Sequence, residues 1–193
     1  MDNWDTLYDI CKNCARCPLS KTRTNVVIGR GSREADIMFI GEGPGFHEDQ
    51  QGLPFVGPAG QLLDKMLAAV NMSEENVYIA NIVKCRPPGN RDPRPEEQEK
   101  CIDYLRYQLT LVRPKIIVAL GRIAANAIIS GDENPYREEF RITKHRGIWF
   151  ERKGIQIMAT YHPSALLRDE TKKRPAWEDF KSIKFRAEQL AKG

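Results

Sequence analysis

Four short apolar stretches rich in β-branched residues recur along the chain, separated by segments with helical periodicity. The stretches are Asp36–Ile40 (DIMFI), Val77–Val83 (VYIANIV), Lys115–Leu120 (KIIVAL) and Ile155–Thr160 (IQIMAT). Their apolar residues run on without polar alternation, which is typical of parallel strands buried on both faces. This pattern constrains the fold strongly, because parallel strands can be joined only by long crossover connections, usually helices.

Helical patterns fill the intervals between these stretches. We predict helices over Pro58–Val70, Pro95–Leu111, Ala124–Ile129 and Trp177–Leu190. Acids at Glu96 and Glu97 suit the positive end of a helix dipole at the start of the second of them. The alternation predicts an α/β fold, a three-layer α/β/α sandwich with a central four-stranded parallel sheet. A length of 193 residues predicts one domain over residues 1–193.

Residues with unusual chemistry follow the ends of three of the predicted strands. Gly41-Glu42-Gly43-Pro44-Gly45 follows the first, Asn81 lies near the end of the second, and His162-Pro163-Ser164 follows the fourth. Ligands of open parallel sheets bind outside the carboxyl ends of the strands. We therefore expect an acid, an amide and an imidazole to meet in one active site. Taken singly, each residue also has a structural interpretation: a solvated loop acid, a cross-strand amide, or a buried histidine bonded to backbone groups.

The glycine-rich turn after the first strand has the shape of a ligand loop without the composition of a phosphate site. It lacks the lysine and spacing of a P-loop and the GxGxxG spacing of dinucleotide-binding folds, so no nucleotide cofactor is expected. Glu42 and Glu48 suit a neutral ligand or a water molecule better than a phosphate. Phe55 lies in a second loop, between glycine and proline residues, and is either core or a stacking platform.

Five cysteines form a second group: Cys11, Cys14, Cys17, Cys85 and Cys101. The first three have C-x2-C-x2-C spacing, which lets thiolates from a single loop converge on one metal centre. The last two give a C-x15-C pair at the end of the second strand and in the helix that follows. Zinc and iron–sulfur clusters both take four thiolates, and the pattern alone does not choose between them. The other possibility is a set of unrelated buried thiols.

The net charge and the N-terminal segment indicate the broad class of protein, that is, where it is located and what it binds. A net charge of +4 permits a nucleic-acid partner without arguing strongly for one. The segment MDNWDTLYDI has neither the basic start nor the apolar core of a secretory signal, and no apolar run approaches membrane-spanning length. We therefore expect a cytoplasmic protein without a membrane partner, in which stable disulfides do not form. Nothing in the sequence demands an oligomer, so a monomer is expected.

Four motifs in this order resemble those of the family 4 uracil-DNA glycosylases, iron–sulfur members of the uracil-DNA glycosylase superfamily. They are Cys14-Ala-Arg-Cys17-Pro18-Leu19, GEGPG from Gly41, NIVKCRPPGNR from Asn81, and HPSALLR from His162. The resemblance runs from about Cys14 to beyond Arg168. It implies a monofunctional DNA repair enzyme that flips uracil out of DNA, hydrolyses its N-glycosidic bond and leaves an abasic site. Its partner would be uracil-containing DNA, which implies association with the nucleoid.

The resemblance also implies roles for the pocket residues. Glu42 would position or activate the attacking water, and His162 would donate a hydrogen bond to uracil O2 as negative charge develops there. Phe55 would stack on the base, Asn81 would bond N3–H and O4, and Glu48 would crowd a thymine methyl group. The implied uracil-binding set is Gly41, Gly43, Glu48, Phe55, Asn81 and His162.

DNA contacts and metal ligands follow from the same resemblance. Leu166 would fill the gap left by the flipped nucleotide, with Leu167 as the alternate. The implied phosphate contacts are Arg86, Arg91, Arg94, Arg168, Lys172, Lys173 and Arg174. A structural [4Fe–4S] cluster, with zinc as the less favoured metal, would tie the segment 11–17 to the rest of the domain. Its ligands would be Cys14, Cys17, Cys85 and Cys101, and Cys11 could replace one of the first two.

A second hypothesis is a binding module of the same fold, which binds uracil-DNA or recruits replication proteins without turnover. Some relatives trap uracil-DNA covalently through a basic insertion, and the equivalent region here, residues 89–95, lacks it. No lysine is placed as an obvious Schiff-base nucleophile, so strand cleavage is not expected. Release of free uracil over many turnovers distinguishes the enzyme from the module.

Overall fold

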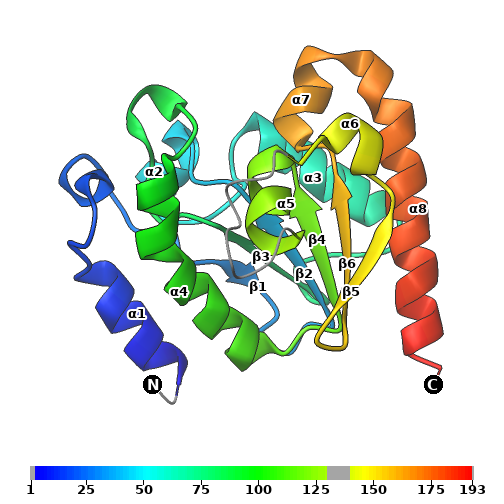
Figure 1. The fold of residues 1–193 in the computed structure, drawn as a ribbon, viewed down its shortest axis with the longest axis horizontal. Coiled ribbons are helices and arrows are strands. Elements are labelled where there is room, and N and C mark those ends of the chain that lie inside the picture. Colours follow the sequence, from blue (N-terminus) through cyan, green and yellow to red (C-terminus); the bar gives the residue numbers. More distant parts are fainter. Residues whose placement is uncertain (1–2, 130–139, 193) are drawn as a thin grey trace.

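The computed structural model describes residues 3–129 and 140–192. Within those residues the sheet has six strands in the order β1-β3-β2-β4-β6-β5 (Figure 1). The strands are β1 (Arg30–Gly31), β2 (Ile37–Gly41), β3 (Val77–Asn81), β4 (Ile116–Leu120), β5 (Trp149–Arg152) and β6 (Ile155–Thr160). The predicted α/β class is confirmed, and the four predicted stretches are β2, β3, β4 and β6, which pair in parallel.

Two antiparallel edge strands extend the predicted four-stranded sheet. β1 pairs with β3, and β5 pairs with β6. The sequence did not predict them, because β1 has two residues and β5 (WFER) is a partly exposed strand without a continuous apolar run. Their effect is to cover both edges of the parallel sheet, so that the parallel strands lie in its interior.

Helices follow the strands as expected, with small differences at their ends. α3 begins with proline at its first position, where the missing N–H has no intrahelical partner to lose. The helix predicted from Trp177 begins four residues earlier, at Lys173. The helices are α1 (Trp4–Lys12), α2 (Phe46–Gln51), α3 (Pro58–Ala69), α4 (Pro95–Val112), α5 (Arg122–Ile129), α6 (Ile142–His145), α7 (Pro163–Arg168) and α8 (Lys173–Leu190).

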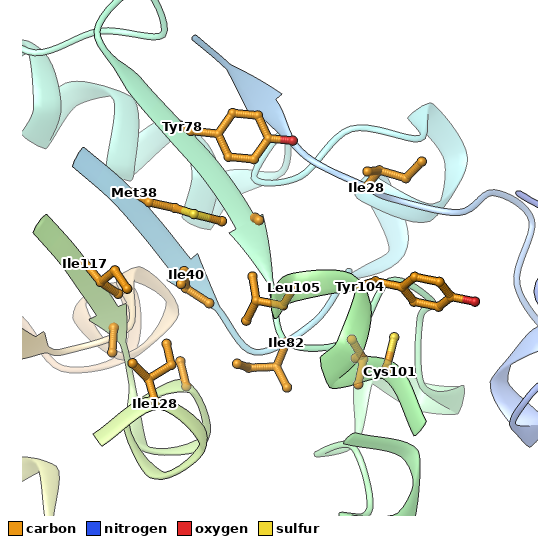
Figure 2. Packing of buried hydrophobic residues seen from close by; sticks show 14 of the residues in the cluster. Ile28, Met38, Ile40, Tyr78, Ile82, Cys101, Tyr104, Leu105, Ile117 and Ile128 are labelled. Atoms are coloured by element: carbon orange, nitrogen blue, oxygen red, sulfur yellow. The ribbon is translucent and has the colours of Figure 1, made fainter. Parts of the chain in front are cut away.

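The sheet carries one hydrophobic core on each face, because strand side chains alternate between the faces. Met38 and Ile40 of β2 belong to the core shared with α1, α4 and α5, and Figure 2 shows Ile40 beside Ile82 and Leu105. Phe39, the residue between them, belongs to the core under α3 and α8. The helices therefore lie in two layers around the sheet (Figure 1), which is the predicted sandwich.

The carboxyl ends of the parallel strands bring distant loops together. Gly41, the last residue of β2, is the register partner of Asn81, the last residue of β3. Pairing continues one step further, where the Ile82 and Val83 amides donate to the carbonyls of Gly41 and Glu42 at 2.9 and 3.1 Å.

None of the helices in the described residues combines the length and apolar character needed to cross a membrane.

Candidate active site

A cavity of about 550 Å³ opens at the carboxyl edge of the sheet. The loops that follow β2, β3, β4 and β6 all contribute to its lining. The predicted acid, amide and imidazole, Glu42, Asn81 and His162, line it together with Glu48 and Phe55. The structure thus brings together residues that lie up to 120 positions apart in the sequence.

Glycines in the turn after β2 let the cavity walls approach one another. A Cβ atom on Gly41 would lie 2.5 Å from Asn81 Oδ1 and 2.6 Å from Phe55 Cζ. A Cβ atom on Gly43 would lie 2.6 Å from a methyl group of Val83. These separations are far below van der Waals contact, so any larger residue would displace the side chains that shape the cavity.

Asn81 presents an unpaired acceptor to the cavity. Its side chain is 2% exposed, and within the described residues its Oδ1 atom has no hydrogen-bond partner. An unsatisfied buried acceptor costs about 1–3 kcal/mol. The site therefore favours a ligand that places a hydrogen-bond donor opposite Oδ1.

Phe55 forms an aromatic wall on a strained backbone. Its φ of +55° lies in the left-handed region, which is unusual for a bulky residue. Its carbonyl approaches Gly60 so closely that a Cβ atom there would lie 1.8 Å away, and Arg30 donates to the same carbonyl at 3.2 Å. The ring lies 5.5 Å from that of His162, with 32° between the planes. A flat apolar face is thereby fixed next to the imidazole.

Glu48 holds two loops of the cavity together. One carboxylate oxygen accepts from the backbone amides of Val56 and Gly57 at 2.9 and 2.8 Å, and the other accepts from Gly45 at 3.1 Å. Three backbone donors fix this carboxylate at the cavity wall and link the glycine-rich turn to the Phe55 loop.

The structure determines which nitrogen of His162 carries the proton. His162 caps α7, and its Nδ1 atom accepts from the Ser164 backbone amide at 3.1 Å, with Ser164 Oγ at 2.8 Å. An amide can only donate, so Nδ1 is unprotonated and Nε2 carries the hydrogen. Burial, assisted by Arg168, lowers the pKa of His162 to about 4. The ring is therefore a neutral Nε2–H donor at physiological pH.

Glu42 is a carboxyl group poised to titrate near neutrality. Burial, with a smaller contribution from Asp92, raises its pKa to about 7, against the opposing effect of Arg122 and Arg168. Asp92 and Arg122 form an ion pair of 3.0 Å, and both line the cavity. A carboxyl group with this pKa suits a general base.

Sequence reasoning missed several of the residues around these groups. Arg122 lies at the carboxyl end of β4, so the strand-end argument that found Glu42 would also have found it. Ser164 was seen only as part of a motif, although a hydroxyl two residues after a capping histidine is a signal for ring positioning. Phe46, 50% exposed at the cavity lining, has a local sequence that gives no such signal.

The two leucines predicted as wedge and alternate differ in exposure. Leu166 is 1% exposed and packs inside the protein, whereas Leu167 is 49% exposed. The two residues point in different directions because successive residues of α7 lie about 100° apart around the helix axis. Leu167, the predicted alternate, is therefore the exposed leucine of α7, and which of the two enters DNA stays a prediction.

The predicted phosphate contacts differ in how far other residues engage them. Arg168 is exposed and lines the cavity. Arg86 lies over the Phe46 ring at 5.1 Å and donates to the Asn90 side chain at 2.7 Å. Arg91 instead makes two bonds of 2.9 and 2.7 Å to the buried carboxylate of Glu97, so its guanidinium is engaged by the fold.

The remaining predicted phosphate contacts lie at the surface. Arg94, Lys173 and Arg174 are exposed, and Lys172 is half-buried. Lys172 and Lys173 pair with Asp169 and Glu170 at 3.0 and 2.6 Å.

All five cysteines line a second, enclosed cavity between α1, the segment after it, the end of β3 and α4. Arg23 donates to Cys85 Sγ at 3.2 Å, and the Lys84 amide donates to Cys101 Sγ at 3.3 Å. Among the described residues, no three cysteine, histidine or acidic side chains converge as a site for a single metal ion. The cavity that the thiols line is small, about 10 Å³.

Lys84 adds a buried positive charge to this cavity. It lines the cavity and is 1% exposed. Burial lowers its pKa to about 8, while the nearby thiols of Cys101, Cys11 and Cys85 favour the charged form. A buried ammonium beside sulfur ligands, with N–H donors to two of the sulfurs, is the environment expected around a thiolate-bound, negatively charged group. The residues present thus fit such a group.

The chain is similar to known proteins over most of its length. The family model described as "Uracil DNA glycosylase superfamily" matches residues 28–181. The chain is 45% identical to the Type-4 uracil-DNA glycosylase of Archaeoglobus fulgidus, with 95% of this chain and 92% of that protein covered. It is 44% identical to the Type-4 enzyme of Thermotoga maritima, over 90% and 88% of the two chains. Identity to a Type-5 uracil-DNA glycosylase of Pyrobaculum aerophilum is 32%, over 84% and 83%.

Proposed function

Because this chain belongs to the uracil DNA glycosylase superfamily, we propose that a uracil flipped out of DNA binds in the cavity at the carboxyl edge of the sheet. The family and its curated relatives support uracil excision for DNA repair, with the chain acting as a hydrolase of N-glycosyl bonds. The assignment to this cavity rests chiefly on one observation, the buried and unpaired Oδ1 atom of Asn81.

Base recognition follows from that acceptor. The N3–H group of uracil is a donor and would satisfy Asn81 Oδ1, whereas N3 of cytosine is an acceptor and would face it unpaired. Phe55 supplies the flat wall on which the ring stacks. Glu48, fixed by three backbone donors, forms a rigid wall against the 5-methyl group of thymine. The site thereby distinguishes uracil from cytosine and from thymine, the two natural pyrimidines of DNA.

The catalytic groups match the charges that develop in the reaction. As the N1–C1′ bond breaks, its electron pair leaves with uracil, and the Nε2–H of neutral His162 donates to O2 of the departing anion. The sugar becomes cationic and faces the Glu42 carboxylate. Glu42 takes a proton from water as the water oxygen bonds to C1′, and release of that proton to solvent balances the proton that the departing uracil anion takes up, so the carboxylate is restored. The products are free uracil and an abasic site, with no covalent enzyme intermediate.

DNA contacts surround the mouth of the cavity. Leu167 enters the space left by the flipped nucleotide, since it is the exposed leucine of α7. Arg86 and Arg168 contact phosphates on either side, and Phe46 with its stacked guanidinium offers a surface for a neighbouring base. We give Arg91 a structural role, because Glu97 already neutralises its charge.

The cysteine cavity is the site we propose for a [4Fe–4S] cluster. Its ligands are Cys14, Cys17, Cys85 and Cys101, and its role when bound is to join the N-terminal segment to β3 and α4. The resemblance of the cysteine motif to that of the family 4 enzymes favours a cluster over zinc, and the four proposed ligands all line this cavity. Cys11 is 1% exposed within the core and is the thiol left over.

Replacing Asn81 with leucine tests the assignment of the base pocket. We expect kcat/KM for uracil excision to fall by about 10²-fold or more, because the variant offers no partner to N3–H. Stability is expected to change by less than about 1 kcal/mol, since an unpaired buried acceptor is removed together with the side chain. Release of free uracil from single- and double-stranded oligonucleotides gives the rates, and thermal unfolding gives the stability.

The parent protein is the reference for this test and also separates the enzyme from a binding module. Many equivalents of free uracil per protein molecule identify a catalyst, whereas one equivalent or less identifies a module without turnover. An Asn81→Leu variant with unchanged kcat/KM would remove the basis for placing uracil in this cavity.

The two leucines of α7 provide a matched pair for the wedge assignment. Leu167→Ala is expected to leave stability within about 0.5 kcal/mol and to slow excision from duplex DNA much more than from single strands, which have no stack to refill. Leu166→Ala is expected to cost about 2–5 kcal/mol of stability, because it opens a cavity in the core. The reverse pattern in unfolding and duplex assays would restore Leu166 as the wedge.

A further inference from the structure

We propose that Lys84 is a positioning residue that couples the cysteine cavity to the uracil pocket. The inference rests on the function and cluster proposed above and goes beyond them by assigning this buried lysine a role. Lys84 lies between the two sites in the sequence, three residues after Asn81 and one before Cys85.

The ammonium of Lys84 forms a hydrogen bond with Asn81, the residue proposed to recognise the base. Its Nζ atom donates to the backbone carbonyl of Asn81 at 2.7 Å and to the side chain of Gln108 at 2.5 Å. Gln108 is itself held by Tyr78 and by the carbonyl of Ile28, at 3.0 and 2.9 Å. The position of the Asn81 backbone, and with it the direction of Oδ1, is therefore set by a fully buried network.

The backbone of Lys84 forms a hydrogen bond with a residue of the cysteine cavity. Its amide donates to Cys101 Sγ at 3.3 Å, and its carbonyl accepts from Val27 at 2.8 Å. The same short segment also reaches the catalytic loop, because Val83 donates to the carbonyl of Glu42 at 3.1 Å. A displacement of this segment at the cysteines would move Asn81 first, because the Lys84 ammonium holds its carbonyl directly, whereas Glu42 meets the segment only through its own backbone carbonyl.

Charge gives a second reason for the coupling. Within residues 3–129 and 140–192, neither hydrogen-bond partner of the Lys84 ammonium is a carboxylate. A buried cation is costly unless an anion lies nearby. The cysteine cavity that Lys84 lines is the place where thiolates would supply that negative charge. Lys84 thus balances the charge of that cavity while it holds the Asn81 carbonyl.

Lys84→Met tests this role, because methionine keeps much of the side-chain length and removes the ammonium. The control is Lys100→Met, which removes one positive charge from an exposed lysine lining the same cavity. Two quantities are measured on purified holoprotein: the rate of iron loss to a chelator, and the dissociation constant of free uracil. KM and kcat are then measured with uracil-containing DNA.

For Lys84→Met we expect iron loss to accelerate and uracil binding to weaken by about 10–100-fold each, as for other residues that orient metal-site groups. KM should rise by a similar factor with kcat within about threefold, because Glu42 and His162 keep their own contacts. Lys100→Met should match the parent in all of these. Unchanged uracil binding in Lys84→Met, or equal changes in Lys100→Met, would overturn the proposal.

Gln108→Met serves if Lys84→Met does not fold. It removes one partner of the ammonium and should shift iron loss and uracil binding in the same direction by about 2–10-fold, with unchanged values counting against the coupling. Failure of this inference is distinguishable from failure of the proposed function. In the first case the parent protein contains iron and releases uracil but the variants behave like it, and in the second the parent itself lacks iron or releases no uracil.

Discussion

Glu42→Gln is expected to lower kcat for uracil excision by about 10²–10⁴-fold, the usual contribution of a positioned general base. Glutamine keeps the shape of the side chain but can neither accept the proton of water nor oppose the positive charge of the sugar. The fold should be unaffected, because an uncharged side chain is easier to bury than a carboxylate. Excision rates under single-turnover conditions, together with thermal unfolding, measure the two effects.

The pH dependence gives the same assignment an independent signature. The active form of Glu42 is the carboxylate, and its pKa is raised to about 7, chiefly by burial. The parent kcat/KM should therefore fall about tenfold per pH unit below neutrality and level off above it. His162 adds no titration there, because its pKa is lowered to about 4. This fall of kcat/KM below neutral pH, the acidic limb of the profile, should be absent from Glu42→Gln.

Asp92→Asn is the matched control for that limb. Asp92 contributes to raising the pKa of Glu42, and its loss leaves the cation of Arg122 unpaired beside the carboxyl group. Both effects lower the pKa, so the midpoint of the limb should move to lower pH while kcat at high pH is kept. A limb that stays in place in both variants would show that another group is the base.

Cys101→Ala is expected to lower the stability of the protein and to remove its bound iron together. Cys101 lies on α4, whereas its proposed fellow ligands lie after α1 and after β3, so loss of one ligand should release the elements that the cluster joins. We expect loss of bound iron and a destabilisation on the order of 3 kcal/mol, which corresponds to a fall of about 6–12 °C in Tm. Iron analysis, visible absorbance and thermal unfolding provide the measurements.

Cys11→Ala separates the ligands from the additional thiol. Cys11 is more buried than Cys14 and Cys17 and lies within α1, in the core packed against α4. The variant should retain the iron content of the parent. Iron loss in Cys11→Ala with retention in Cys14→Ala or Cys17→Ala would exchange their roles. A colourless parent protein that contains zinc would show that the site holds zinc and not an iron–sulfur cluster.

Patterns within single segments of the sequence were enough to predict much of the fold. The apolar runs at β2, β3, β4 and β6 were long and continuous enough to predict the parallel sheet, and helical periodicity placed α3 and α4. The strand-end argument then predicted that Glu42, Asn81 and His162 would share a cavity. That argument works because strand direction is fixed by topology, so each strand delivers its C-terminal residues to the same edge.

Features that depend on a distant partner were not predictable in this way. β1 is a strand only because β3 lies beside it, and β5 only because β6 does. The apolar pattern did not distinguish Leu166 from Leu167, since both are leucines and only the packing of α7 decides which one is buried. The bidentate pair of Arg91 with Glu97 was not predicted either, although the two residues lie only six positions apart, because spacing across a loop does not show which way a side chain turns.

The sequence by itself determined the four parallel strands with the helices between them, the residues delivered to the sheet edge and the grouping of the cysteines, because these follow from local periodicity and chain direction. The tertiary structure alone decided the tautomer of His162, the unpaired acceptor of Asn81 and the position of the Lys84 ammonium between two sites. Hydrogen bonding, burial and charge at a given atom depend on every element packed around it, and no single segment of the chain contains that information.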